Sequence, residues 1–266
     1  MRTATSLISI LKLIALAALC TACSHTIDFR ASHFAIPIVS DEQGGGYFSI
    51  SGSQPTKVKV ISDRASNPPG RDFAINEEDI AEDFFETLFA VDLIGIELGV
   101  SVLPSLEIYT YGGSLFGLKW QLIGDSKQGN GLVASIQGGY GKFSTTSSSG
   151  STTTTEEAKS AVTTTQYGGS LGYKAGSAVF YVSHIQNAHS VETDVVNPSG
   201  TFGPYEDSGI HGSTSIGIST YAKALLIGLE YTITKAVWDP DTTLAPNHNG
   251  AEDQSEGGGI RIGLKW

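Results

Sequence analysis

Alternation with a period of two is the feature that most limits how this chain can fold. In several segments apolar residues occupy every second position, and small, polar or charged residues fill the positions between. Successive side chains of an extended strand point to opposite faces of a sheet, so each segment predicts a two-faced strand and not a helix. The clearest segments are 94–102, 115–123, 131–140, 165–174 and 225–234, and further strand-like runs are 105–111, 177–187 and 213–221.

The same alternation runs to the last residue of the chain. Ile260, Ile262, Leu264 and Trp266 share one parity, and Arg261, Gly263 and Lys265 share the other. A half-buried strand of a soluble β-sandwich could show this pattern. A strand that ends on an aromatic carboxyl-terminal residue also resembles the sorting and assembly signal of bacterial outer-membrane β-barrel proteins. On that resemblance, Ile260, Ile262, Leu264 and Trp266 would form the assembly signal.

The expected connections between strands alternate in length, with one exception, the tight turn Gly112-Gly113-Ser114 on the side of the long connections. Read backwards from Trp266, they are 237–256 (long), 221–223 (short), 188–211 (long), 174–177 (short), 144–161 (long) and 125–130 (short). Outer-membrane barrels have short periplasmic turns and long external loops, and a soluble sandwich has no reason to separate loop lengths by side. Residues 45–266 therefore resemble outer-membrane β-barrel proteins through generic features. The resemblance implies an all-β, antiparallel, up-and-down transmembrane β-barrel, with both termini in the periplasm and an even number of strands.

The expected strand number is about ten to twelve. The run 33–39 contains Pro37, which cannot donate a ladder hydrogen bond, so it is either a strand or part of a tether that precedes the barrel. A hairpin of 46–52 with 56–62 is expected next, with Lys57 and Lys59 facing inward. Residues 75–88 could form a helix over the barrel mouth or run directly into the following strand.

The amino terminus predicts export. Leu7 to Leu19 is apolar apart from Ser9 and Lys12, too short for a membrane-spanning helix of about 20 residues, so residues 1–22 read as a signal peptide. The stretch from Leu19 to Ser24 is similar to a bacterial lipoprotein processing site, although Cys20 stands where leucine is usual. The resemblance implies lipidation of Cys23; cleavage near Ala22 by ordinary signal peptidase is the alternative. We expect a lipidated tether over 23–44 and a barrel domain over 45–266.

Charge and composition exclude several classes of function. The net charge of −11 and the lack of a basic stripe argue against nucleic acid as a partner. Neither an EF-hand spacing nor a phosphate-binding glycine loop is present, so we expect no metal and no cofactor. The resemblance implies the bacterial outer membrane as location, and outer-membrane lipid, the barrel assembly machinery and the lipoprotein export machinery as partners. Residues 144–155 are only Ser, Thr and Gly and read as a solvated mobile spacer.

The inward face of the predicted barrel is polar and carries charges of both signs. Such charges could pair and fill the lumen, or they could line a narrow pore, and ten to twelve strands lie between the filled and open barrel sizes. Unpaired charge in a dry interior is costly, which favours the filled lumen. The predicted lumen-facing residues are Lys57, Lys59, Glu97, Glu107, Lys119, Gln121, Gln137, Gln166, Lys174, Glu230, Arg261 and Lys265.

An enzymatic function has little support in the sequence. Barrel hydrolases use a serine and a histidine at the rim. Ser183 with His184, and His189 with Ser190, offer these residue types, but no hydrolase motif surrounds them. We therefore predict a non-enzymatic envelope or surface component with a filled lumen. The alternatives are a narrow pore for small solutes and a lipid-active barrel enzyme.

Overall fold

The computed structural model describes residues 23–30, 32–53, 55–63, 70–75, 93–151, 154–197, 200–220, 224–239 and 250–266. The expected signal peptide (1–22) and almost all of the helix considered for 75–88 lie outside these residues. All regular secondary structure in the described ranges is β-strand. Within them, no helix has the length and apolar character needed to cross a membrane.

The described ranges contain thirteen strands, and all pairings between them are antiparallel. They are β1 (Cys23–Arg30), β2 (Gly46–Ser53), β3 (Pro55–Asp63), β4 (Gly70–Ile75), β5 (Leu93–Leu103), β6 (Leu106–Tyr111), β7 (Leu115–Ile123), β8 (Asn130–Ser151), β9 (Thr154–Ala175), β10 (Ala178–Asn197), β11 (Gly200–Thr220), β12 (Leu225–Asp239) and β13 (Ala251–Lys265).

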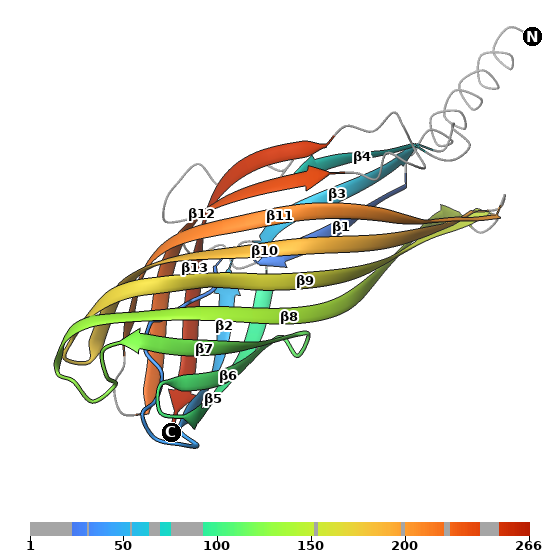
Figure 1. Cartoon of the computed structure of the whole chain (residues 1–266). Coiled ribbons are helices and arrows are strands. Elements are labelled where there is room, and N and C mark those ends of the chain that lie inside the picture. Colours follow the sequence, from blue (N-terminus) through green and yellow to red (C-terminus); the bar gives the residue numbers. More distant parts are fainter. Residues whose placement is uncertain are drawn as a thin grey trace, which may run out of the picture.

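Ten of these strands form one sheet that closes into a ring (Figure 1). Strands β5 to β13 follow one another in sequence order around the ring, and β2 lies between β13 and β5. The predicted all-β, antiparallel, up-and-down architecture is confirmed at this level, and ten strands lie within the expected number. Each alternating segment named above lies, wholly or for most of its length, in a strand of the ring, because period two is what a two-faced strand requires.

A second sheet of three strands has the order β1-β3-β4. The predicted hairpin of 46–52 with 56–62 is wrong: β2 pairs with β13 and β5, whereas β3 pairs with β1 and β4. Lys57 and Lys59 therefore lie in the second sheet and not in the wall of the ring. Alternation in 56–62 identified a strand correctly but holds no information about which partner that strand takes.

The expected long loops between β8 and β11 are mostly strand. The four strands have 20 to 22 residues each, and the two hairpins reach beyond the ring, away from the carboxyl terminus (Figure 1). Residues 144–151 pair with 154–161, so the interpretation of 144–155 as a mobile spacer is wrong for the described part of it. Ladder hydrogen bonds need no apolar side chain, and threonine favours extended backbone, so a Ser/Thr tract can continue a hairpin that is already registered.

The side chains of the ring are distributed in the reverse of the usual soluble pattern. Large apolar side chains on its outer face are exposed, for example Trp120 (55%), Ile216 (65%) and Leu264 (61%). Charged side chains that point inward are buried, among them Glu97, Lys119 and Arg261. Monomeric soluble proteins rarely expose large contiguous apolar surface, so this outer face marks the ring as a surface of interaction. The exposed apolar residues of the ring include Phe48, Ile50, Ile96, Leu98, Ile108, Phe116, Leu118, Trp120, Leu132, Ile136, Leu171, Phe180, Val182, Ile216, Ile218, Leu225, Ile227, Ile262 and Leu264.

Candidate functional site: the filled lumen

Residues 32–45, which we call the lumen segment, run through the interior of the ring. The backbone N–H of His33 donates to Glu230 Oε1 at 2.9 Å, and that of Val39 donates to Gln121 Oε1 at 2.7 Å. Glu230 lies on β12 and Gln121 on β7, so the segment contacts distant parts of the wall. Phe34 is 2% exposed and Val39 is fully buried. The interior of the ring thus holds a segment of its own chain.

The lumen segment connects the two ends of the ring. At one end, β1 stops at Arg30, which pairs with Pro55 just beyond the end of β2. At the other end, Gly46 N donates to Trp266 O and Trp266 N donates to Gly46 O, both at 3.0 Å. The Trp266 indole Nε1 also donates to Gly44 O at 3.1 Å. The described amino-terminal strand and the carboxyl terminus therefore lie at opposite ends of the ring.

This arrangement corrects two expectations. Both termini were expected at one end, and 23–44 was interpreted as a tether outside the barrel. An even number of ring strands places the start of β2 and the end of β13 together, which is observed, but does not constrain the chain before β2. A signal for the lumen segment was present in the sequence: residues 34–39 are apolar without alternation and contain Pro37, which suits a buried segment outside any ladder.

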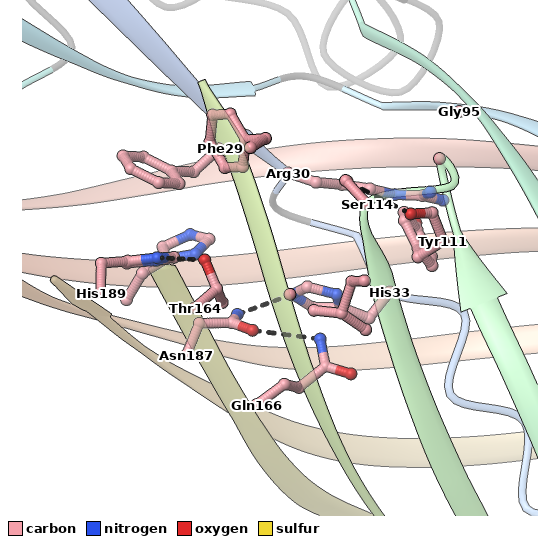
Figure 2. Close-up of a pocket in the computed structure, with 15 residues that line it drawn as sticks. Phe29, Arg30, His33, Gly95, Tyr111, Ser114, Thr164, Gln166, Asn187 and His189 are labelled. Atoms are coloured by element: carbon pink, nitrogen blue, oxygen red, sulfur yellow. Dashed lines mark hydrogen bonds between the residues drawn. The ribbon is translucent and has the colours of Figure 1, made fainter. Parts of the chain in front are cut away.

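A directed chain of hydrogen bonds holds His33 (Figure 2). Tyr109 OH donates to Gln166 Oε1 at 2.8 Å, and Gln166 Nε2 donates to Asn187 Oδ1 at 3.0 Å. Asn187 therefore presents its Nδ2 donor to His33 Nε2, 3.3 Å away. Since His33 Nε2 accepts this bond, the proton of the neutral ring belongs on Nδ1.

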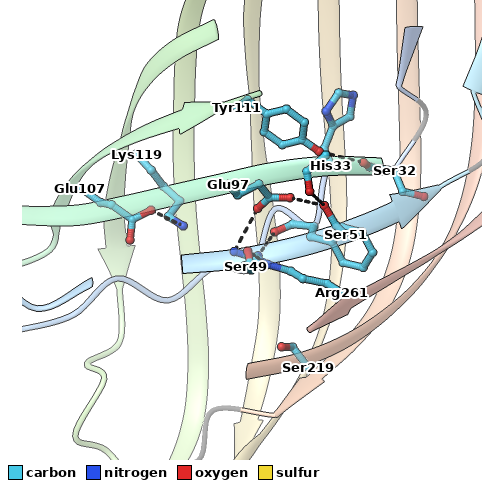
Figure 3. Close-up of polar contacts among 12 residues, drawn as sticks. Ser32, His33, Ser49, Ser51, Glu97, Glu107, Tyr111, Lys119, Ser219 and Arg261 are labelled. Atoms are coloured by element: carbon cyan, nitrogen blue, oxygen red, sulfur yellow. Dashed lines mark hydrogen bonds and ion pairs between the residues drawn. The ribbon is translucent and has the colours of Figure 1, made fainter. Parts of the chain in front are cut away.

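The strongest electrostatic feature of the lumen is a carboxylate shared by two guanidinium groups (Figure 3). Arg30 Nη2 lies 3.0 Å from Glu97 Oε1, and Arg261 Nη2 lies 3.0 Å from Glu97 Oε2. Ser51 Oγ accepts from Arg30 Nη2 at 2.7 Å and donates to Glu97 Oε1 at 3.0 Å. These ion pairs and hydrogen bonds join β1, β5 and β13 across the lumen.

Arg261 also fixes the lumen segment directly. Its Nη1 donates to Phe34 O at 3.3 Å, and its Nε donates to Ser49 Oγ at 2.9 Å. The guanidinium carbon lies 4.5 Å from the centroid of the Tyr47 ring, within cation–π range. A second ion pair, Lys119 Nζ to Glu107 Oε1 at 2.9 Å, lies nearby and is also buried. Glu97 and Glu107 are thus each paired with a buried cation.

Most of the sequence-predicted lumen residues lie within the ring. Glu97, Glu107, Lys119, Gln121, Gln166, Lys174, Glu230 and Arg261 are buried. Gln137 and Lys265 are half-buried, and Lys57 and Lys59 belong to the second sheet. Sequence reasoning missed Arg30, His33, Tyr109 and Asn187, which complete the two networks. Arg30 and His33 precede β2, and Asn187 lies on β10, where segment 177–187 shows no clean alternation. The positions of these three side chains could therefore not be predicted from alternation.

The residues of the predicted assembly signal lie on the last strand and at the terminus. Ile262, Leu264 and Trp266 are exposed on the outer face (55%, 61% and 57%), and Ile260 is half-buried. Cys23, the predicted lipidation site, is the first residue of β1 and lies at the end of the molecule opposite Trp266.

The serine and histidine pairs considered for catalysis do not form nucleophile–base pairs. Ser183 is 4% exposed and faces inward, whereas His184 is exposed and bonds Thr214 through Nδ1. His189 is 6% exposed and faces inward, whereas Ser190 is exposed. Adjacent strand residues point to opposite faces, so neither pair can share a proton. Within the described residues, no group of His, Cys, Asp and Glu side chains is arranged to hold a metal ion.

No protein-family model matches the chain, and a search of curated proteins found no significant match.

Proposed function

We propose that this protein is an outer-membrane β-barrel lipoprotein of the bacterial envelope whose lumen is closed by its own amino-terminal segment. It acts as a non-enzymatic structural or surface component. The observation that carries the proposal is the lumen segment, which is held from three strands by Gln121, Glu230 and Arg261.

The outer face of the ring supports membrane insertion. Exposed apolar side chains surround a polar interior, which is the distribution of a barrel in lipid. In this orientation the Trp266 end faces the periplasm, and the β8–β11 hairpins face the outside. Outer-membrane lipid is the direct partner, and the barrel assembly and lipoprotein export machineries deliver the chain.

The space left in the lumen favours a closed barrel over a narrow pore. Two cavities beside Tyr47, lined only by described residues, hold about 20 Å³ each. A single water needs about 10–15 Å³, so each cavity has room for roughly one water molecule. Neither of these two cavities could hold the continuous column of water that ion conduction requires.

Two measurements test the proposal. The folded protein should require detergent and migrate differently on gels with and without boiling; a folded protein that stays soluble without detergent contradicts membrane insertion. In planar bilayers, the inserted wild-type protein should give no discrete conductance steps. Reproducible steps from the wild type would establish a pore and overturn the closed lumen.

The variant Lys119→Glu separates the filled from the conducting lumen. Its carboxylate would meet Glu107, the present partner of Lys119, in a buried site, so we expect a lower free energy of unfolding and still no conductance. The reversed pair Lys119→Glu with Glu107→Lys should recover part of the lost stability. An inserted Lys119→Glu protein with altered ion selectivity and unchanged stability would favour the pore.

A further inference from the structure

A cavity of about 230 Å³ lies inside the ring, beside the amino-terminal end of the lumen segment. We call it the mouth pocket. It is open on one side, and its wall combines aromatic side chains with imidazoles: Phe29, Tyr111, Phe143, His33, His189 and His211 (Figure 2). It is smaller than the roughly 300–1,000 Å³ of pockets for drug-sized ligands, so it suits a molecule of about ten non-hydrogen atoms.

The charge of the mouth pocket differs from that of the whole chain. The chain has 27 acidic and 16 basic residues, yet none of the described residues that line the pocket is Asp or Glu. The lining residues include one guanidinium, Arg30, and three histidines. In a protein of net charge −11, a concave surface without carboxylates favours a ligand that is anionic or rich in hydrogen-bond acceptors.

Arg30 carries an unused donor at this site. Its Nη2 bonds Ser51 and Glu97, and its Nε donates to Ser32 O, but its Nη1 has no hydrogen-bond partner among the described residues. The side chain is only 8% exposed, so water does not replace that partner freely. A Cβ at Gly95 would come within 2.8 Å of Nη1, so the glycine leaves the space that this nitrogen occupies. Beside it, the guanidinium carbon lies 3.9 Å from the centroid of the Tyr111 ring.

The opposite side of the pocket is aromatic and also has a free nitrogen. The rings of Phe29 and His189 have centroids 4.1 Å apart. His189 Nδ1 bonds Thr164 Oγ1 at 2.9 Å, and its Nε2 has no partner among the described residues although the side chain is buried. A flat ligand could stack against these rings while a charged end reaches Arg30.

We propose that the mouth pocket binds a small aromatic carboxylate, with the carboxylate at Arg30 Nη1 and the ring against Phe29 and His189. The proposal goes beyond the envelope role, because it concerns a cavity that exists whether or not the lumen conducts; only the lipid medium of its test rests on the proposed membrane insertion.

The test is calorimetric titration of the full-length refolded protein in lipid nanodiscs with benzoate. Benzyl alcohol and benzylamine serve as neutral and cationic probes of similar size. We expect benzoate to bind with a Kd of roughly 0.1–1 mM, a realistic affinity for so small a ligand, and benzyl alcohol to bind at least about tenfold more weakly. Equal affinity for the three probes, or no heat from benzoate up to about 10 mM, overturns the proposal.

Two variants locate the binding site. Ser114 lines the pocket, so Ser114→Trp should fill it and abolish benzoate binding. Ser190→Trp is the matched control, because Ser190 is exposed on the outside of β10. Arg30→Gln should weaken benzoate at least about tenfold while leaving benzyl alcohol unchanged. If Arg30→Gln does not fold, the Ser114 variant decides alone: retained binding in Ser114→Trp contradicts the site.

Discussion

At the scale of single residues, Glu97 is the charge on which the order of the lumen depends. Its two carboxylate oxygens face two arginines that come from opposite ends of the sequence, Arg30 and Arg261. Breaking a buried ion pair by removing one partner leaves an uncompensated charge, which costs more than the pair itself contributes. Removal of the Glu97 carboxylate leaves two such charges, on Arg30 and on Arg261.

Glu97→Gln should therefore destabilise the protein by about 3–5 kcal/mol, measured as the free energy of unfolding by urea in detergent or lipid. The matched control is Glu252→Gln. Glu252 pairs with Lys235 at the surface, where both side chains are 60% exposed. The control should change stability by less than about 1 kcal/mol. Equal effects of the two substitutions would mean that the lumen network is solvated.

His33 makes the stability of the protein depend on pH. It lies in the lumen segment, outside the ring strands, and burial together with His211, Arg30 and His189 holds its pKa well below 6.5. Its backbone N–H faces Glu230, and its Nε2 faces Asn187. The unfolded chain, where the pKa is near 6.5, binds a proton that the folded protein excludes. The contribution to stability is therefore present above pH 6.5 and is lost as the pH falls below it.

We expect His33→Asn to reduce the slope of unfolding free energy against pH below 6.5, by at most about 1.4 kcal/mol per pH unit, the value for one proton. Other groups keep their own contributions, so only the difference from wild type is informative. His184→Asn, at an exposed position on the outer face, is the control. An unchanged slope in His33→Asn would show that His33 is already protonated, or hydrated, in the folded protein.

At the scale of elements, the β8–β9 hairpin has a distal part that stands beyond the ring. Thr146 pairs with Lys159, and Ser147 pairs with Ala158. Replacing residues 147–158 by a two-residue Asn-Gly turn would keep the register of everything below. We expect this protein to fold, to remain heat-modifiable on gels, and to change its free energy of unfolding by less than about 1 kcal/mol. Failure to fold would assign the distal hairpin a role in assembly.

The sequence predicted the strands of the ring well and the remaining elements poorly, for one physical reason. Parity reports which face a side chain takes only when one face meets lipid or solvent and the other meets the interior. Segment 225–234 obeys this rule, so β12 and its inward Glu230 were predictable. The lumen segment is surrounded by the ring on all sides, so its side chains do not alternate between two environments. Pro37 indicates only that the segment is not a paired strand. The Ser/Thr tract at 144–151 has no apolar face, so its strand depends on register inherited from Leu132 to Tyr140.

The residues of the candidate site were predicted from the sequence to the same extent as the fold: the ring positions were predicted, and the contacts from outside the ring were not. Glu97, Lys119 and Arg261 follow from inward parity, but their partners do not. Arg30 reaches Glu97 only because β1 ends at the mouth of the ring, a position that depends on pairing with β3. Tertiary pairing of this kind leaves no local pattern in the sequence, and so neither the Arg30–Glu97 pair nor the mouth pocket could be anticipated.

At the scale of the whole molecule, the outer face distinguishes a membrane protein from a soluble ring. Leu118 is 52% exposed on β7, between Phe116 and Trp120, which are also exposed. In lipid, Leu118→Arg should destabilise the inserted protein by about 2–4 kcal/mol. In a soluble protein the same exposed substitution should be nearly neutral. Thr214→Arg, on the polar part of the outer face, is the comparison. Refolding yields and urea midpoints in vesicles measure both.

The continuity of the lumen segment with β1 at one end and β2 at the other has a consequence for how the molecule is made. The lumen segment continues into β1, which belongs to the second sheet. Once that sheet has folded, the lumen segment cannot easily be threaded through a closed ring, so we expect the ring to close around it. The seam between β13 and β2 joins the last ring strand in sequence order to the first, so it is the natural place for the wall to stay open until all ring strands are present. In the proposed orientation, the same order of events carries the Cys23 end to the outer side before the gap shuts. An acyl chain on Cys23 would then sit in the leaflet that faces the environment, on the far side of the membrane from Trp266.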